Sequence, residues 1–287
     1  MPLVLRTAYW HDARARAAFE DLIRDVFGLD FSAWEAAGYW DDAYVPFTLF
    51  DGERAVASVC MYLMDAVVDG RARPLVQVSG VSTRLEWRRR GLSRQQLEAG
   101  LDWARQRTRG SFLFANEEAV PLYRQVGFAP CEEYIESIAA PPVSHRPGAR
   151  RLDMGAAHDR DLLYALAQRR DVVSDRFGVR NARLLMFHAM YRLRDGVWAV
   201  PELDCAVLAQ REAGVLRVYD VVAERMPRWS ALYPYLADAS DRRIEFNFAT
   251  DKLGLAGVAR QPLVGNNCHV GDGFPLAAPV FPFTVRA

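Results

Sequence analysis

The stretch EWRRRGLSRQQL, residues 86–97, connects an apolar segment to an amphipathic one. Three arginines, Arg88–Arg90, stand before Gly91 and Ser93, and the apolar residues that follow recur at helical spacing. At a helix N-terminus the first N–H groups lack partners and carry partial positive charge, and glycine lets the backbone approach a phosphate closely. The stretch therefore predicts a pyrophosphate site at a strand-to-helix junction. A solvated basic helix start is the alternative.

Composition limits the function classes. The chain has 287 residues, 51% of them hydrophobic and 25% charged, which suits a globular protein of two domains. The formal net charge is +0, so a dedicated nucleic-acid binder is disfavoured, although Arg88–Arg90 and Arg150–Arg151 keep that alternative open. Lys252 is the only lysine, which excludes a phosphate loop of the G-x-x-x-x-G-K type in the first 250 residues.

The cysteines and the apolar runs bear on location. The 4 cysteines are widely separated and form no C-x-x-C pair, which predicts reduced thiols and no zinc site or other metal. We find no signal sequence and no apolar run of the roughly 20 residues that a membrane span needs. We therefore expect a cytoplasmic protein that binds no membrane and is a monomer or a homodimer.

The proline-rich segment SIAAPPVSHRPGAR, residues 137–150, predicts a break between two domains. We expect a domain at residues 1–139, a linker at 140–150 and a second domain at 151–287. In the first domain, two Asp-Gly turns separate three apolar segments and predict an antiparallel meander. The expected order is β-α-α-β-β-β-α-β-α-β, ending in a strand at 133–139.

Two motifs identify a family. The pattern Arg88-x-x-Gly91-x-Ser93 after GVSTRLEW resembles the (Q/R)-x-x-G-x-(G/A) signature of the GNAT superfamily of N-acetyltransferases, with Ser93 departing slightly from the usual Gly or Ala. NEEAVPLYRQVGF, residues 116–128, resembles the N-x-x-A-x-x-L-Y-x-x-x-G-F segment of the same family. The resemblance covers roughly residues 3–139. It implies an α/β (α+β) fold with a mixed, mostly antiparallel sheet flanked by helices.

The resemblance also implies roles for particular residues. Tyr123 would donate a proton to the departing thiolate, and acetyl-CoA would be the co-substrate. An amide at the end of the third meander strand would polarise the acetyl carbonyl. The residues implied to hold the pyrophosphate, the pantetheine arm and the rest of the cofactor are Val81, Ser82, Thr83, Arg88, Arg89, Arg90, Gly91, Leu92, Ser93 and Asn116.

The acceptor site and the base are less defined. The aromatic cluster of Trp34, Tyr39, Trp40 and Tyr44 predicts either ordinary packing or a pocket that binds an amine by apolar and cation–π contacts. We take Trp40, Asp41, Tyr44 and Gln77 as candidate substrate-binding residues. Further candidates that could order a water, attract the amine or act as base are Ser79, Asp42, Glu132, Glu133 and His269.

Residues 151–287 repeat the order of elements of the first half, ending in a strand at PVFPFTV. They lack the two motifs, so we expect a second, degenerate GNAT-like α/β lobe that covers the acceptor side, as in tandem members of the superfamily. Tandem acetyltransferases of the "enhanced intracellular survival" type place their C-terminal carboxylate in the active site. This makes the Ala287 carboxylate a candidate base.

Two functions remain at this point. The first is an acetyl-CoA-dependent N-acetyltransferase that moves an acetyl group directly to a primary amine of a small molecule or peptide. The alternative is a non-catalytic acyl-CoA-binding regulatory module, which would explain an intact cofactor site without an obvious base.

Overall fold

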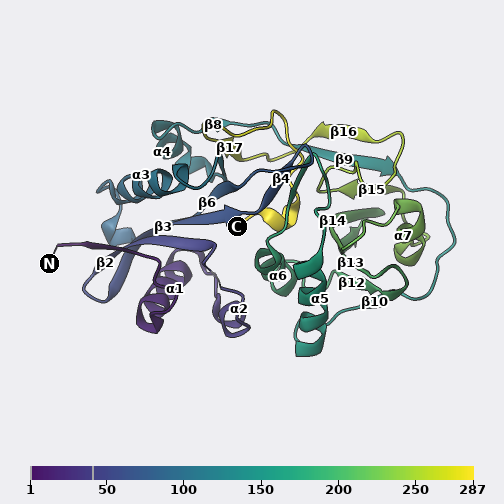
Figure 1. Cartoon of the computed structure of the whole chain (residues 1–287), viewed down its shortest axis with the longest axis horizontal. Coiled ribbons are helices and arrows are strands. Elements are labelled where there is room, and N and C mark those ends of the chain that lie inside the picture. The colour runs from purple at the N-terminus through teal and green to yellow at the C-terminus, as the bar shows by residue number, and fades with distance from the viewer. Residues whose placement is uncertain (1, 41) are drawn as a thin grey trace.

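The computed structural model describes residues 2–40 and 42–287, so the candidate Asp41 lies outside the described residues. Two mixed, mostly antiparallel sheets stand side by side, each with helices on both faces (Figure 1). The α/β fold class expected from the sequence is confirmed. Within the described ranges, no helix is both long enough and apolar enough to cross a membrane.

The first sheet is built mainly from the N-terminal half. Its strand order is β1 (Val4–Thr7), β2 (Tyr44–Asp51), β3 (Arg54–Met64), β6 (Leu75–Thr83), β7 (Ser111–Phe114), β17 (Cys268–Val270) and β8 (Ala129–Pro130). Helices α1 (Ala13–Phe27) and α2 (Ser32–Ala36) lie on one face, and α3 (Leu92–Arg105) and α4 (Val120–Gln125) on the other (Figure 1). Short 3-10 turns, η1 (Leu85–Trp87) and η2 (Glu117–Ala119), precede α3 and α4.

Local sequence signals account for most of these elements. Asp12 caps α1 by accepting hydrogen bonds from the Arg14 and Ala15 amides, and Gly28 ends the helix at a φ of 66°. Asp69 and Gly70 both have positive φ, as a type I′ hairpin requires. That turn forms an additional hairpin of β4 (Ala66–Val68) and β5 (Arg71–Ala72), so the apolar run before it is not one continuous strand.

The second sheet repeats this plan. Its order is β10 (Arg150–Arg151), β12 (Val197–Val200), β13 (Cys205–Glu212), β14 (Val215–Ala223), β15 (Arg243–Phe246), β9 (Tyr134–Ala139) and β16 (Ala259–Pro262). Helices α5 (Ala157–Arg169) and α6 (Ala182–Met190) pack on one face and α7 (Trp229–Leu236) on the other. The parallel pair β14–β15, joined through α7, corresponds to the parallel pair β6–β7, joined through α3.

The two sheets exchange strands, which the sequence did not predict. The strand expected to close the first domain, β9, pairs with β15 and β16 in the second sheet. In return β17 inserts between β7 and β8 of the first sheet. Residues 140–149 contain no helix or strand, as a linker requires. The division of the chain into domains at 139 and 151 stays a prediction, because each sheet contains a strand from beyond that boundary.

The prediction of a strand at PVFPFTV is wrong. Residues 279–282 have no regular structure, and η4 (Phe283–Val285) follows them. Pro279 and Pro282 lack the N–H groups that a strand ladder needs. The chain end therefore runs as an irregular segment between the lobes, beside β3, β6 and α6 (Figure 1).

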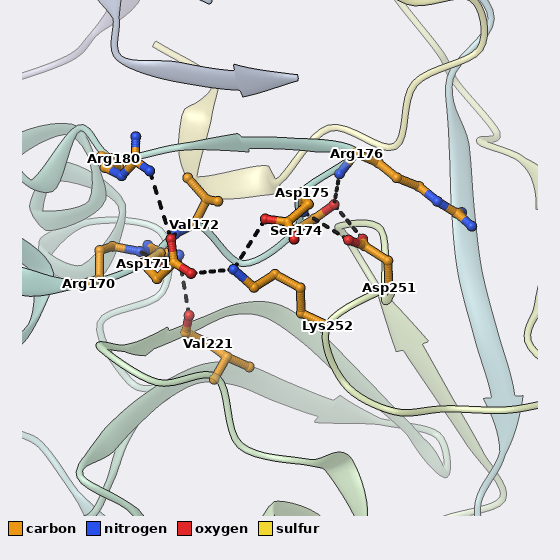
Figure 2. A network of polar contacts seen from close by, with 10 residues as sticks. All are labelled: Arg170, Asp171, Val172, Ser174, Asp175, Arg176, Arg180, Val221, Asp251 and Lys252. Atoms are coloured by element: carbon orange, nitrogen blue, oxygen red, sulfur yellow. Dashed lines mark hydrogen bonds and ion pairs between the residues drawn. The ribbon is translucent and has the colours of Figure 1, made fainter. Parts of the chain in front are cut away.

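A polar network of the second lobe holds the segment that follows α5 (Figure 2). Lys252 Nζ contacts the Asp171 carboxylate and lies 3.3 Å from Asp175 Oδ1. Asp251 accepts hydrogen bonds from Ser174 Oγ at 2.6 Å and from the Asp175 amide at 2.9 Å. These contacts fix the segment that continues into β11 (Phe177–Val179), which pairs with β4 of the first lobe.

Candidate active site

A groove of about 710 Å³ opens at the N-terminus of α3. Gly91 caps this helix at a φ of 74° and offers no side-chain acceptor, so the first amides of α3 have no intrahelical partner. Arg89 also has positive φ (62°), which folds the loop tightly against the helix end. Backbone amides, helix dipole and arginines together make this end of the groove a site for a phosphate anion.

The structure brings most of the predicted cofactor residues into this groove. Ser93 Oγ lies 2.8 Å from Thr83 Oγ1, which links the first turn of α3 to the end of β6. Arg88 donates from Nε to the Thr83 carbonyl at 3.1 Å. The predicted residues that line the groove are Val81, Thr83, Arg88, Arg89, Gly91, Leu92, Ser93 and Asn116.

Two predicted cofactor residues do not line the groove. Ser82 is buried, and its hydroxyl donates to the Ser58 carbonyl at 3.4 Å. The Arg90 guanidinium lies 4.7 Å from the centre of the Trp87 ring and donates to the Glu86 carbonyl at 2.9 Å. The side chains of Ser82 and Arg90 are therefore engaged with the protein itself.

A β-bulge lies at the inner end of the groove. Across β3 and β6, Ser58 faces Ser82 and Cys60 faces Ser79, so the two residues Gly80 and Val81 stand opposite the single residue Val59. A bulge of this kind leaves a residue outside the ladder. The register of β6 with β7 runs from Val76 to Val78, while β6 continues to Thr83, so the two parallel strands separate at the same place. The backbone of the bulge is therefore available to a bound group.

Arg84, which the sequence analysis did not single out, anchors the end of β6. Arg84 is 4% exposed, and its guanidinium pairs with Asp21 at 2.5 Å and with Asp25 at 2.9 Å, both on α1. Its Nε donates to the Ala55 carbonyl at 2.8 Å. These bonds fix β6 directly beyond the bulge.

Tyr123 lies on α4. The preceding residue, Leu122, lines the groove, as does Ala119 at the end of η2. Its side chain is 6% exposed and packs edge-on against the Phe128 ring, with the centroids 6.3 Å apart. Burial raises the pKa of Tyr123 to about 12. The hydroxyl therefore keeps its proton at neutral pH, as a general acid must.

A small apolar pocket of about 40 Å³ lies between the lobes. Six of the side chains that line it are aromatic or aliphatic: Phe31, Trp34, Tyr44, Tyr62, Leu184 and Phe187. Ala287 lines it as well. Of the predicted substrate-binding residues, Tyr44 lines the pocket, whereas Trp40 lies behind it, with its ring centre 6.5 Å from that of Trp34.

The last two residues of the sequence are held beside this pocket. The Ala287 amide donates to Gln77 Oε1 at 3.1 Å, and Gln77 Nε2 donates to the Ala287 carbonyl at 3.3 Å. Arg286 pairs with the buried Glu133 carboxylate and lies 4.1 Å from the centre of the Phe114 ring. His188 on α6 holds the Arg286 carbonyl through Nε2 at 2.7 Å. Neither Arg286 nor His188 could be selected from the sequence, because no local motif marks them.

The other base candidates lie in different surroundings. Glu133 is buried and its pKa is raised by burial, although the Arg286 guanidinium opposes this shift. Glu132 is exposed and accepts a hydrogen bond from Tyr134. Asp42 is exposed, and Ser79 is buried beside the bulge. His269, expected in a loop, lies in β17, where Nδ1 is 3.1 Å from the Asn267 carbonyl.

Stability should fall in acid because of His188. Burial lowers its pKa from 6.5 to about 4, so the unfolded chain binds this proton at a higher pH than the folded chain does. His188 should therefore reduce the unfolding free energy progressively as the pH falls from about 6.5 to about 4, by ~3 kcal/mol in total. Urea unfolding at several pH values measures this slope. In His188→Gln we expect a shallower slope over this range, and an unchanged slope would contradict the assignment.

The segment that carries the groove matches a known family. Residues 14–131 match the family model of the acetyltransferase (GNAT) domain, and this segment contains the groove, the bulge and Tyr123. This part of the chain is a GNAT acetyltransferase domain. The recognition made from the two motifs is confirmed. No relative among the curated proteins matches the chain.

Solved structures extend the fold likeness over almost the whole chain. A conserved protein of unknown function from Enterococcus faecalis V583 aligns with a TM-score of 0.60 and 14% identity, covering 94% of this chain and 72% of that one. Eis1 from Mycobacterium abscessus aligns with a TM-score of 0.54 and 17% identity, covering 94% and 73%. A GCN5-related N-acetyltransferase from Kribbella flavida gives 0.52 and 16%, covering 94% and 71%. At these identities the likeness concerns the fold alone.

Proposed function

We propose that the protein is an acetyl-CoA-dependent N-acetyltransferase that transfers an acetyl group directly to a primary amine of a small molecule or peptide. The observation that carries the proposal is the continuity of the groove. It begins at the N-terminus of α3, which has no side-chain cap, and includes Val81 of the bulge in β6. This path suits a long ligand with a phosphate at one end and a reactive carbonyl at the other. The residues present fit acetyl-CoA.

The chain would hold acetyl-CoA at two places. The first-turn amides of α3, with Arg88 and Arg89, would bind the pyrophosphate. The backbone of β6 from Val81 to Thr83 would bind the pantetheine arm, where β7 no longer pairs with it. When bound, acetyl-CoA supplies an activated acyl group whose carbonyl an amine can attack and whose thiolate can leave.

The chain's own groups would then stabilise the reaction. A backbone amide at the Gly80–Val81 bulge would donate to the carbonyl oxygen as negative charge develops there. Tyr123 would give its proton to the departing sulfur, so that free CoA leaves as a thiol and the amide product forms. The amine must lose a proton first, because an alkyl amine with a pKa near ~10.4 is mostly protonated at pH 7.

Ala287 is our proposed acceptor of that proton. Its carbonyl oxygen is held by Gln77 beside the apolar pocket, so a carboxylate at this residue would stand where the amine enters. Adding two residues after Ala287 is expected to abolish turnover and leave acetyl-CoA binding unchanged. Turnover at the original rate would rule Ala287 out as the base.

The second lobe is proposed to be a degenerate copy of the first that no longer binds CoA. Its strand order and its parallel pair repeat those of the first lobe, and α6 contributes Leu184 and Phe187 to the pocket. Its task would be to cover the acceptor side of the first lobe.

The test is a thiol-release assay with acetyl-CoA and a panel of primary amines, with mass spectrometry of the products. The proposal predicts one acetylated amine for each thiol released. Binding of acetyl-CoA without acylation of any amine would contradict it and favour a non-catalytic acyl-CoA-binding module.

A further inference from the structure

We propose that Cys131 and Cys268 form a site of reversible oxidation, at which a peroxide converts the two thiols into a disulfide. The proposal is independent of acetyl transfer. Both cysteines are buried free thiols, Cys131 directly after β8 and Cys268 at the start of β17. β17 is the strand that the later part of the chain inserts into the first sheet. A disulfide at Cys268 would therefore make this strand exchange covalent.

The pairing of β8 with β17 places the two cysteines directly opposite each other. His269 faces Pro130 in this antiparallel register, so the next pair along it is Cys268 and Cys131. The Cys131 amide donates to the Cys268 carbonyl at 3.0 Å. Directly opposed residues carry their side chains on the same face of a sheet, with Cα atoms about 4.5–5.5 Å apart. A disulfide needs a Cα separation of about 4.4–6.8 Å, so it can form without a shift of the backbone.

The Asn266 side chain holds this spacing. Its Nδ2 donates to the Cys131 carbonyl at 2.6 Å, and its Oδ1 accepts from the Cys268 amide at 2.9 Å. The two thiols are also hydrogen-bonded to each other. The sulfur atoms of Cys131 and Cys268 are therefore in contact in the reduced protein.

The surroundings of the two thiols give them different roles. A hydrogen bond from the Cys268 thiol, with a second from the Ala278 amide, lowers the pKa of Cys131 against the effect of burial. The same contact with Cys131, together with burial, raises the pKa of Cys268. Cys131 is also the more exposed of the two, at 7% against 1%. Because the thiolate is the reactive form, Cys131 reacts with the oxidant and Cys268 completes the disulfide.

The reaction balances with hydrogen peroxide as the oxidant. The Cys131 thiolate attacks one peroxide oxygen, the O–O bond breaks, and hydroxide leaves a sulfenic acid on Cys131. The Cys268 sulfur then attacks the Cys131 sulfur, so that the S–S bond forms, the S–O bond breaks and a second hydroxide leaves. The two protons lost by the thiols convert both hydroxides to water. Reduction by a small dithiol restores the two thiols.

The other two cysteines are internal controls. Cys60 faces Ser79 and Cys205 faces Ala223 across their strand pairs, so neither has a cysteine opposite it. Burial raises the pKa of each of these thiols to about 12. Cys60 and Cys205 should therefore remain thiols under conditions that oxidise the pair.

The experiment treats the reduced full-length protein with a small excess of hydrogen peroxide and counts free thiols after denaturation. We expect the four thiols to fall to two, and dithiothreitol to restore all four. Peptide mapping by mass spectrometry should find Cys131 linked to Cys268 within one chain. The link closes a loop of roughly 140 residues, so the unfolding temperature should rise by about 5 °C or more.

Matched variants separate this pair from the other thiols. Cys131→Ser is expected to form no disulfide and to show no rise in unfolding temperature on treatment with peroxide. Cys205→Ser makes the same change at a control thiol and is expected to form the link as the wild type does. If Cys131→Ser does not fold, the thiol count and the peptide map of the wild type decide the question alone.

Four free thiols after peroxide has oxidised a cysteine-containing peptide in the same mixture would overturn the proposal. So would a link that involves Cys60 or Cys205, a link that joins two chains, or a sulfinic acid on Cys131 without a link. A linked protein with a lower unfolding temperature would contradict the spacing on which the proposal rests.

Discussion

Ser93→Asp is expected to weaken acetyl-CoA binding by about a hundredfold or more while the protein stays folded. Ser93 is the second residue of α3 and lines the groove. A carboxylate there would face the proposed pyrophosphate, and two unit charges ~4 Å apart near a protein surface interact by about 4 kcal/mol before screening by salt. The same carboxylate favours the helix, because negative charge at a helix N-terminus is stabilising. Calorimetric titration measures the affinity, and thermal unfolding measures the stability.

Ser93→Asn is the matched control for this change. It has nearly the same size as Asp and no charge, so we expect it to weaken binding by less than about tenfold, the loss of roughly one hydrogen bond. A Ser93→Asp protein that binds acetyl-CoA as tightly as the wild type would mean that the phosphates do not lie at the N-terminus of α3.

Tyr123→Phe is expected to lower kcat by about a hundredfold or more, which is the range of general acid catalysis. Removing one oxygen leaves the ring packed against Phe128, so acetyl-CoA affinity and unfolding free energy should change little. Steady-state kinetics beside calorimetry separates these effects. A kcat within a few-fold of the wild type would remove Tyr123 from the chemistry and favour a non-catalytic function.

The pKa of Tyr123 adds a second expectation from the same residue. A general acid works in its protonated form, so activity is lost as the pH rises through its pKa. Burial moves that pKa from 10.0 to about 12, so the rate in the wild type should keep rising with pH while the amine loses its proton. A rate that falls above about pH 9 would mean that a different group supplies the proton.

Much of the first lobe could be predicted, because its signals are local. Asp12 and Gly28 mark the ends of α1, and the Asp69-Gly70 pair forms the turn that its sequence favours, with positive φ at both residues. Two motifs with fixed spacing, with the segment before the first of them, predicted the cofactor residues. Most of these residues line the groove, whereas the side chains of Ser82 and Arg90 contact the protein instead. The recognition of the family depended on the same spacing, since Gly91 and Ser93 must stand at the start of a helix.

The rest depends on contacts between residues far apart in the sequence. The exchange of β9 and β17 could not be predicted, because a three-residue strand such as β17 carries no pattern that names its partner. The hydrogen bond between Arg286 and His188 joins residues separated by 98 positions, and the Arg286–Glu133 pair spans 153 positions. The pocket between the lobes likewise could not be predicted from the sequence, because α6 of the second lobe provides one of its walls.

The most direct test is a calorimetric titration of acetyl-CoA into the wild type and into Gly91→Arg. Gly91 lines the groove and has no atoms within 4 Å of where a Cβ would stand, so the substitution meets no clash at its first side-chain atom. Its positive φ adds some strain, which thermal unfolding can monitor. We predict micromolar binding to the wild type and none to a folded Gly91→Arg protein. No binding to the wild type, or equal binding to both, would contradict a cofactor site at the N-terminus of α3.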